Sequence, residues 1–150
     1  MSRIVSIVPF VLLTLAAAAM GAQFRPGAWY AALQKPAWTP PGWLFGPVWT
    51  VLYVMIALAG WIAWRRQGWS AATGLWLVAL AANGAWSWLF FGRQAIGAAL
   101  VDILVLWLAI AAFIVATWRA SRSASLLFVP YLAWVSFATA LNAAIWRLNS

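Results

Sequence analysis

The stretch that decides the fold is residues 29–53, WYAALQKPAWTPPGWLFGPVWTVLY, in which prolines alternate with aromatic residues. Five of the seven prolines lie between Pro26 and Pro47. Four tryptophans lie in the same segment as these prolines: Trp29, Trp38, Trp43 and Trp49. Since proline fixes φ and removes a backbone donor, residues 35–41 cannot form a regular helix. The run is also too apolar for a solvated loop, so it predicts a stiff aromatic lid, about residues 24–42, that covers an apolar surface and enters a helix near Trp43.

The rest of the chain has the composition of an integral membrane protein. Of its 150 residues, 67% are hydrophobic and 7% are charged, whereas about a quarter of residues are charged in soluble domains. The mean hydropathy is +0.94. The net charge of +8 comes from nine Lys and Arg against one acid, Asp102. Because the cations stand at the ends of apolar runs, we interpret them as anchors to membrane lipid and not as a nucleic-acid surface.

The residue types exclude several kinds of chemistry. The chain has no Cys and no His, so it cannot supply a thiol nucleophile, a Ser-His-Asp arrangement or the usual ligands of a metal site. Axial ligation of haem could come only from Met or Tyr. We therefore expect no required cofactor, and a function that depends on shape, ring stacking and hydrogen bonding.

Apolar runs of roughly 20 residues predict an all-α integral membrane protein with five transmembrane helices in one bundle, forming a single domain over residues 1–150. The expected spans are about residues 4–23, 43–64, 71–91, 95–118 and 126–146. Pro47 falls in the first turn of the second span, where proline is tolerated. Pro130 lies in the first half of the fifth span and is expected to bend it. The first run could also be a secretory signal, but the equally apolar remainder favours a retained span.

An odd number of spans puts the two ends of the chain on opposite sides of the membrane. Five cations fall on one side and four on the other, so the positive-inside rule leaves the orientation open. The five cations on one side are Arg3, Arg65, Arg66, Arg119 and Arg122. The four on the other side are Arg25, Lys35, Arg93 and Arg147.

One carboxylate and two amide side chains lie well inside the expected spans, where each needs a partner. Asp102 makes either a structural hydrogen bond or ion pair, or a contact with a proton or a ligand. Asn83 and Asn142 either join neighbouring helices or face a ligand. Asn83 shares a helical face with Trp86 and Phe90. Both interpretations stay open for each residue.

The tryptophans divide by their depth in the spans. Those at span ends are typical of interface anchors: Trp43, Trp64, Trp69, Trp118 and Trp146. Trp49 and Trp134 lie deeper. Trp49 shares a helical face with Tyr53, and Trp134 shares one with Ala138 and Leu141, where a large ring beside a small residue forms a notch that a flat ligand could enter.

The sequence resembles the translocator protein family, also called TspO or the peripheral-type benzodiazepine receptor. The resemblance rests on the opening stretch and on three further ones: Asn83 with WSWLFFG, ALVDILV at residues 99–105, and PYLAWVSFATALN followed by WRLN. The pattern of animal members that is associated with cholesterol is incomplete, because Ala143 stands where a tyrosine would be. The chain also has no basic tail after Ser150, which favours a bacterial source, with inner or outer membrane undecided.

The resemblance implies a pocket that opens toward the lid, and commonly a homodimer. It implies binding of protoporphyrin IX and haem, of isoquinoline carboxamide or benzodiazepine-type drugs, and in animals of sterol. Carried over by motif, the ligand-binding residues are Trp29, Tyr30, Trp38, Pro41, Trp49, Asn83, Trp134 and Ala138. Four residues that share helical faces with these complete the candidate ligand-binding set: Tyr53, Trp86, Phe90 and Leu141. A cation near the mouth, Arg25 or Lys35, would orient the propionates of a porphyrin. The small residues Ala81 and Ala85 are the expected dimer contact.

Three functions compete at this point. The first is a tetrapyrrole-binding membrane protein that acts as sensor, carrier or scavenger. The second is light-dependent degradation of protoporphyrin, in which Trp49 and Trp134 would react with the excited porphyrin although no general acid or base is placed for ordinary turnover. The third is translocation of porphyrins or sterols. The sequence favours the first, because it lacks the paired, interrupted helices of many secondary transporters.

Overall fold

Uninterrupted apolar runs form the long helices of this chain, and short breaks at glycine, proline or polar residues separate them. The structure is a computed structural model that describes residues 3–150. The elements are η1 (Arg3–Ile7), α1 (Val8–Gln23), α2 (Ala28–Ala32), η2 (Gly42–Leu44), α3 (Phe45–Gln67), α4 (Ala71–Ser87), η3 (Trp88–Gly92), α5 (Ile96–Thr117), α6 (Arg122–Leu127) and α7 (Val129–Leu148). Within this part of the chain, five helical stretches are long and apolar enough to cross a membrane. The predicted fold class is confirmed.

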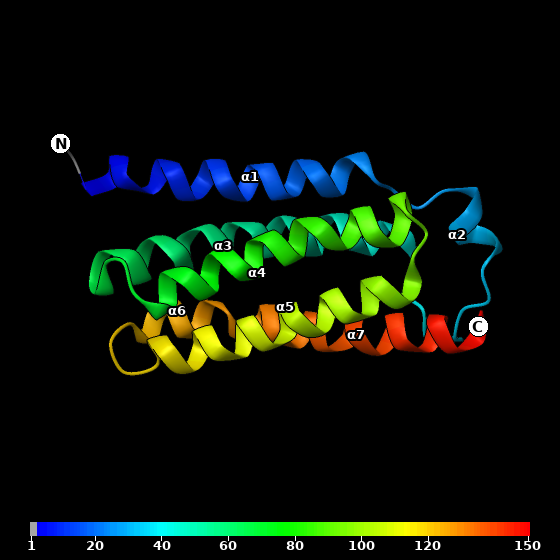
Figure 1. Cartoon of the computed structure of the whole chain (residues 1–150). Coiled ribbons are helices and arrows are strands. Elements are labelled where there is room, and N and C mark those ends of the chain that lie inside the picture. The colour runs from blue at the N-terminus through cyan, green and yellow to red at the C-terminus, as the bar shows by residue number, and fades with distance from the viewer. Residues whose placement is uncertain (1–2) are drawn as a thin grey trace.

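The five spans form a bundle in which consecutive spans run antiparallel (Figure 1). α1 lies against α3 and α4, α4 packs along α5, and α5 packs along α7. The remaining side of the bundle is closed by α6 against α3, whereas α3 and α7 meet over only a short stretch. Within the contact between the second and fifth spans, α3 therefore packs closely on α6 and only loosely on α7.

The lid lies at one end of the bundle. Figure 1 places the segment with α2 beside the last turns of α7, at the end where the C-terminus lies, and the N-terminus lies at the opposite end. Residues 33–41 are not helical, which confirms the expectation drawn from the prolines. The short helix α2 was not predicted, although Ala28–Ala32 contains no proline and follows Gly27.

The fifth span differs from the single bent helix expected from Pro130. It begins at Arg122 and is divided into α6 and α7 at Phe128. Pro130 stands in the first turn of α7, where it removes no helical hydrogen bond, whereas in a continuous helix its ring would clash with the carbonyl of Leu126. The break allows α6 to pack on α3 while α7 continues along α5.

The third span ends in a π-helical turn, η3, that the sequence analysis did not foresee. The amide of Arg93 donates to the carbonyl of Trp88 at 2.7 Å, one residue wider than an α-helical bond. Gly92 lets the exit of α1 approach this turn, because a Cβ at that position would lie 2.8 Å from Cδ1 of Phe24. The widened turn and the close approach bring Phe90 and Phe91 under the lid.

The indole ring of Trp76 in α4 packs on Gly60 of α3 and holds the two helices together. Trp76 is fully buried, and its indole N–H donates to the carbonyl of Ile56 at 2.8 Å. Its ring lies directly on Gly60, where a Cβ would come within 2.4 Å of Cε2. Phe10 of α1 packs edge-on against the same indole, with 5.2 Å between ring centroids. This contact joins the first three spans at the end away from the lid.

Candidate functional site

The lid rests on the bundle through aromatic rings. Trp29 and Tyr30 of α2 contact Phe90, with centroid distances of 5.8 and 6.1 Å. Phe90 in turn stacks on Trp86 at 5.0 Å. Leu141 and Ile145 of α7 complete this cluster. Partial burial in the lid raises the pKa of the Tyr30 phenol above its usual value, so this side chain stays neutral at physiological pH.

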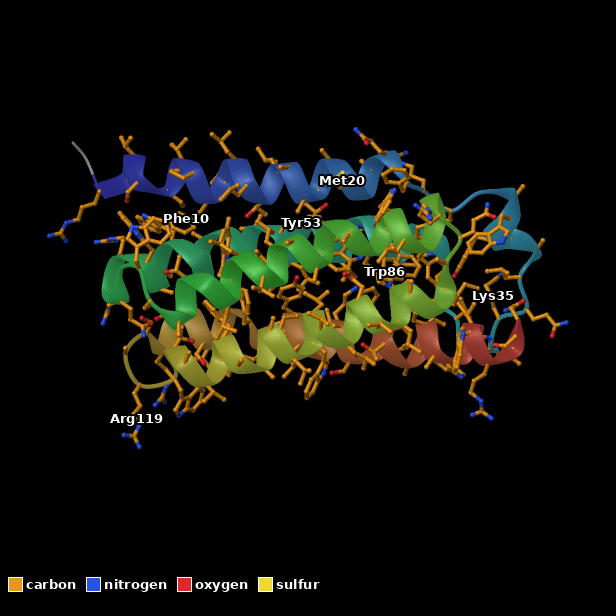
Figure 2. The ribbon with its side chains drawn as sticks, in the orientation of Figure 1. Phe10, Met20, Lys35, Tyr53, Trp86 and Arg119 are labelled. Atoms are coloured by element: carbon orange, nitrogen blue, oxygen red, sulfur yellow. The ribbon has the colours of Figure 1, made fainter. Side chains whose placement is uncertain are left out.

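Lys35 stabilises the lid itself. Its ammonium group donates to the carbonyls of Tyr30 at 2.8 Å, Leu33 at 3.1 Å and Ala31 at 3.3 Å. These carbonyls lie at the C-terminal end of α2, and that of Tyr30 also accepts the amide of Leu33. It also lies 4.7 Å from the centre of the Tyr30 ring, and Figure 2 shows it beside the lid. Of the two cations proposed for the mouth, Arg25 is the one whose side chain is exposed.

Asn142 joins three spans below the lid. The indole N–H of Trp86 donates to Asn142 Oδ1 at 2.9 Å, and Asn142 Nδ2 donates to the carbonyl of Ile96 at 3.1 Å. Both ends of the Asn142 amide therefore have partners in the protein. Figure 2 shows Trp86 between α4 and the helices beneath it.

A second polar contact lies deeper and includes a residue that the sequence analysis missed. Asn83 Nδ2 donates to the hydroxyl of Tyr131 at 2.7 Å, and the Tyr53 hydroxyl donates to Asn83 Oδ1 at 3.4 Å. These bonds link α4 to α7 and α3. Tyr131 is completely buried. Its position three residues before Trp134 in PYLAW, on the same helical face, was the signal that could have found it.

Trp49 faces these tyrosines. Its ring centroid lies 5.5 Å from that of Tyr53 and 6.4 Å from that of Tyr131. The side chain is half-buried and packs on the main core. Trp49, Tyr53 and Asn83 are thus brought together as the sequence analysis expected, around a tyrosine that it had not named.

Trp134 lies in a different place, on a groove between α3 and α7. The groove has a volume of about 600 Å³. Its lining comes from Pro47, Val48, Val51, Leu52, Met55, Pro130, Ala133, Trp134 and Phe137. The ring of Trp134 is tilted by 32° from that of Phe137 at 5.6 Å, and the edge of Phe45 approaches it at 5.8 Å. Sequence analysis missed most of this lining, although Val48, Val51 and Met55 recur at helical spacing.

The indole N–H of Trp134 is the unusual feature of the groove. This nitrogen is buried and has no hydrogen-bond partner among the described residues. A buried donor without a partner is costly, because it has lost its hydrogen bond to water. An acceptor placed in the groove beside Trp134 would remove this cost.

The remaining candidate residues lie in or near the cluster under the lid, the main core and the groove between α3 and α7, except for Asp102 in α5. Ala138 packs on the main core beside Trp134, and Leu141 belongs to the cluster under the lid. Trp38 is exposed on one face and contacts Phe137 at 5.6 Å, whereas Pro41 is exposed before η2. Asp102 is half-buried in α5, and its buried Oδ2 has no hydrogen-bond partner in the part of the chain described.

The arrangement can bind a ligand but offers little for acid–base or metal chemistry. Within residues 3–150, no three His, Cys, Asp or Glu side chains come together as a metal site would need. The groove has an aromatic wall formed by Trp134 and Phe137, and its other lining side chains are apolar. Ligand sites are commonly clefts of about 300–1,000 Å³, and the volume of the groove lies in this range.

Comparison with known proteins agrees with this architecture. The model of the TspO/MBR family matches residues 8–147. The chain is 43% identical to the tryptophan-rich protein TspO of Archaeoglobus fulgidus over 99% of both chains. It is 41% identical to protein CrtK of Rhodobacter capsulatus over 89% of this chain and 86% of the relative. It is 42% identical to the human translocator protein over 87% of this chain and 82% of the relative.

Proposed function

This chain belongs to the TspO/MBR family of multi-pass integral membrane proteins, and from this we propose that it binds flat aromatic ligands of the tetrapyrrole class within the membrane. The protein acts as a sensor, carrier or scavenger of such a ligand, with protoporphyrin IX or haem as the reference compounds. The name translocator protein, carried by the human relative, is in keeping with a ligand that moves through or along the membrane. The homodimer expected from the sequence stays a prediction.

The observation that carries the proposal is the groove between α3 and α7 with the unpartnered indole of Trp134. A tetrapyrrole has a broad apolar face and carboxylate or ring atoms that accept hydrogen bonds. Its face would lie against Trp134 and Phe137, whose rings are tilted by 32°, and an acceptor atom would take the N–H of Trp134. Burial of the macrocycle would provide most of the affinity, and the hydrogen bond would orient it.

Two further contacts support the same location. The lid residue Trp38 touches Phe137, so the lid covers one end of the groove. Arg25 is exposed at the start of the same lid, and it is the cation that we propose for the propionates. A ligand with an apolar disc and acidic side arms therefore suits the site better than a wholly apolar sterol.

The test is a titration of the protein in lipid nanodiscs with protoporphyrin IX, followed by the absorbance shift of the porphyrin. Trp134→Phe keeps a ring and removes the donor, so we expect binding to weaken roughly two- to tenfold, the value of about one hydrogen bond. Trp134→Ala removes the ring as well and should weaken binding further. Trp69→Phe and Trp69→Ala are matched controls, because Trp69 is 82% exposed between α3 and α4 and lies outside the groove lining.

A groove-filling variant tests the location independently of Trp134. Ala133→Trp places a large ring among the lining residues and should abolish most of the binding, whereas Ala16→Trp on the outward face of α1 should leave it unchanged. If Ala133→Trp binds protoporphyrin IX as tightly as the unmodified protein, the ligand does not occupy this groove. If the unmodified protein shows no saturable binding at all, the proposed function is wrong.

A further inference from the structure

The side chain of Asn149, at the end of α7, forms hydrogen bonds with the main chain of the lid. Asn149 Oδ1 accepts the amide N–H of Gln34 at 3.1 Å, and Asn149 Nδ2 donates to the carbonyl of the same residue at 2.9 Å. Both backbone groups of Gln34 are thus paired with a single amide side chain 115 residues away in the sequence. The Asn149 side chain thus bonds the N–H and the C=O of one residue, as the backbone of a neighbouring strand does in a β-sheet.

Asn149 is itself fixed by its helix. Its own backbone N–H donates to the carbonyl of Ile145 at 3.1 Å, and its Nδ2 reaches the same carbonyl at 2.8 Å. The side chain is therefore oriented by the last turn of α7 before it meets the lid. Gln34 occupies a sensitive place in the lid, because it lies between the end of α2 and Lys35, whose ammonium group closes that helix.

The other contacts between the lid and the helices are of a different kind. Trp29 and Tyr30 lie against Phe90, and Trp38 lies against Phe137, through ring edges. In the described part of the chain, the amide of Leu44 donates to the carbonyl of Pro41 where the lid enters its own helix, and the hydrogen bonds that join lid residues 26–41 to a helix distant in the sequence are the two at Asn149. Ring contacts resist separation but allow sliding, whereas paired hydrogen bonds fix direction and register.

We propose that Asn149 is a positioning residue that latches the lid onto α7, and that breaking the Asn149–Gln34 pair sets the rate at which ligand enters and leaves the groove. Trp38 follows Gln34 by four residues and covers Phe137, a lining residue of the groove. Release of Gln34 frees this segment to lift Trp38 from the groove end. The ligand part of this inference rests on the proposed function, whereas the latch itself does not.

Amide hydrogen exchange of the ligand-free protein in nanodiscs tests the latch directly. In Asn149→Ala the Gln34 amide loses its acceptor, and we expect its exchange to become at least fivefold faster, the value of roughly one hydrogen bond. Asn149→Asp places an acceptor oxygen against the carbonyls of Gln34 and Ile145 in place of the donor, so this variant should also speed exchange at Gln34. Ser150→Ala is the matched control, because the Ser150 hydroxyl bonds only the carbonyl of Trp146 in its own helix.

The second measurement is stopped-flow binding and release of protoporphyrin IX. A latch alters the barrier and not the bound contacts, so Asn149→Ala should raise the association and dissociation rates by a similar factor and leave Kd within about twofold. A residue that touches the ligand would instead change Kd.

The outcomes separate the two proposals. Unchanged exchange at Gln34 in Asn149→Ala overturns the latch. Faster exchange with unchanged protoporphyrin rates overturns the control of ligand entry and leaves the latch in place. Absence of protoporphyrin binding in the unmodified protein overturns the proposed function, while the exchange result still decides whether Asn149 holds the lid.

Discussion

Replacement of Gly60 by alanine is the sharpest test of how the first three spans are held together. The added Cβ would lie 2.4 Å from Cε2 and 2.5 Å from Nε1 of Trp76. Since carbon atoms pack favourably at about 3.5–4.0 Å, the ring would have to move by about 1 Å or more. Trp76 cannot move freely, because it is fully buried, bonded to the carbonyl of Ile56 and flanked by Phe10.

Three contributions determine how much Gly60→Ala lowers the free energy of unfolding. Overpacking a tight core costs about 1–3 kcal/mol, and weakening the bond between Trp76 and Ile56 costs about 0.5–1.5 kcal/mol. The higher helix propensity of alanine returns about 1 kcal/mol. Gly60→Ala should therefore lower the free energy of unfolding by about 2 kcal/mol.

Gly74→Ala is the control for this substitution. Gly74 lies in α4, and a Cβ there would meet no atom within 4 Å, so this variant should be as stable as the unmodified protein or slightly more stable. Reversible unfolding in mixed detergent micelles, followed by circular dichroism, measures both variants. If the two have the same free energy of unfolding, the notch at Gly60 does not hold Trp76 as described.

Two further predictions concern the polar groups inside the spans. A double-mutant cycle on Asn83→Ala and Tyr131→Phe, measured by the same unfolding assay, should give a coupling energy of about 0.6–1.7 kcal/mol. Hydrogen bonds between transmembrane helices have coupling energies of this size. If the effects of the two substitutions on the free energy of unfolding are additive, the 2.7 Å bond between these side chains contributes nothing. Asp102→Asn should leave the thermal midpoint unchanged or raise it, because the buried Oδ2 has no partner among the described residues and a charge in the membrane is costly. A clear fall in the midpoint would reveal a partner for the carboxylate.

The sequence predicted those features that depend on local chemistry. Proline at residues 36, 40 and 41 excluded a regular helix from residues 35–41 by stereochemistry alone, and the length of the apolar runs set the number of spans. The break at Phe128 was harder to place. Pro130 requires a disturbance within the preceding turn, but whether the chain bends or restarts there depends on the packing of α6 against α3, which only tertiary structure supplies.

The candidate site was predictable one helix at a time. Helical spacing placed Trp49 beside Tyr53 and placed Asn83 on the face of Trp86, because these relations follow from 3.6 residues per turn. Which residue completes each contact depends on the neighbouring helix. The Tyr131 hydroxyl against Asn83, and the Gln34 main chain against Asn149, both join segments far apart in the sequence. No pattern within one segment could have paired them.

These long-range contacts converge on α7. Its Tyr131 binds Asn83, its Trp134 lies on the groove, its Asn142 binds Trp86, and Asn149 at its end binds Gln34 of the lid. The helix is attached along α5 but meets α3 only briefly, and it is separated from α6 at Phe128. A small rotation of α7 about that break would alter the groove, the buried polar bonds and the lid together. The groove and the lid therefore both depend on the position of one helix. Substitutions at Asn149 are expected to act on ligand exchange through the lid segment that carries Trp38, which contacts Phe137 of the groove.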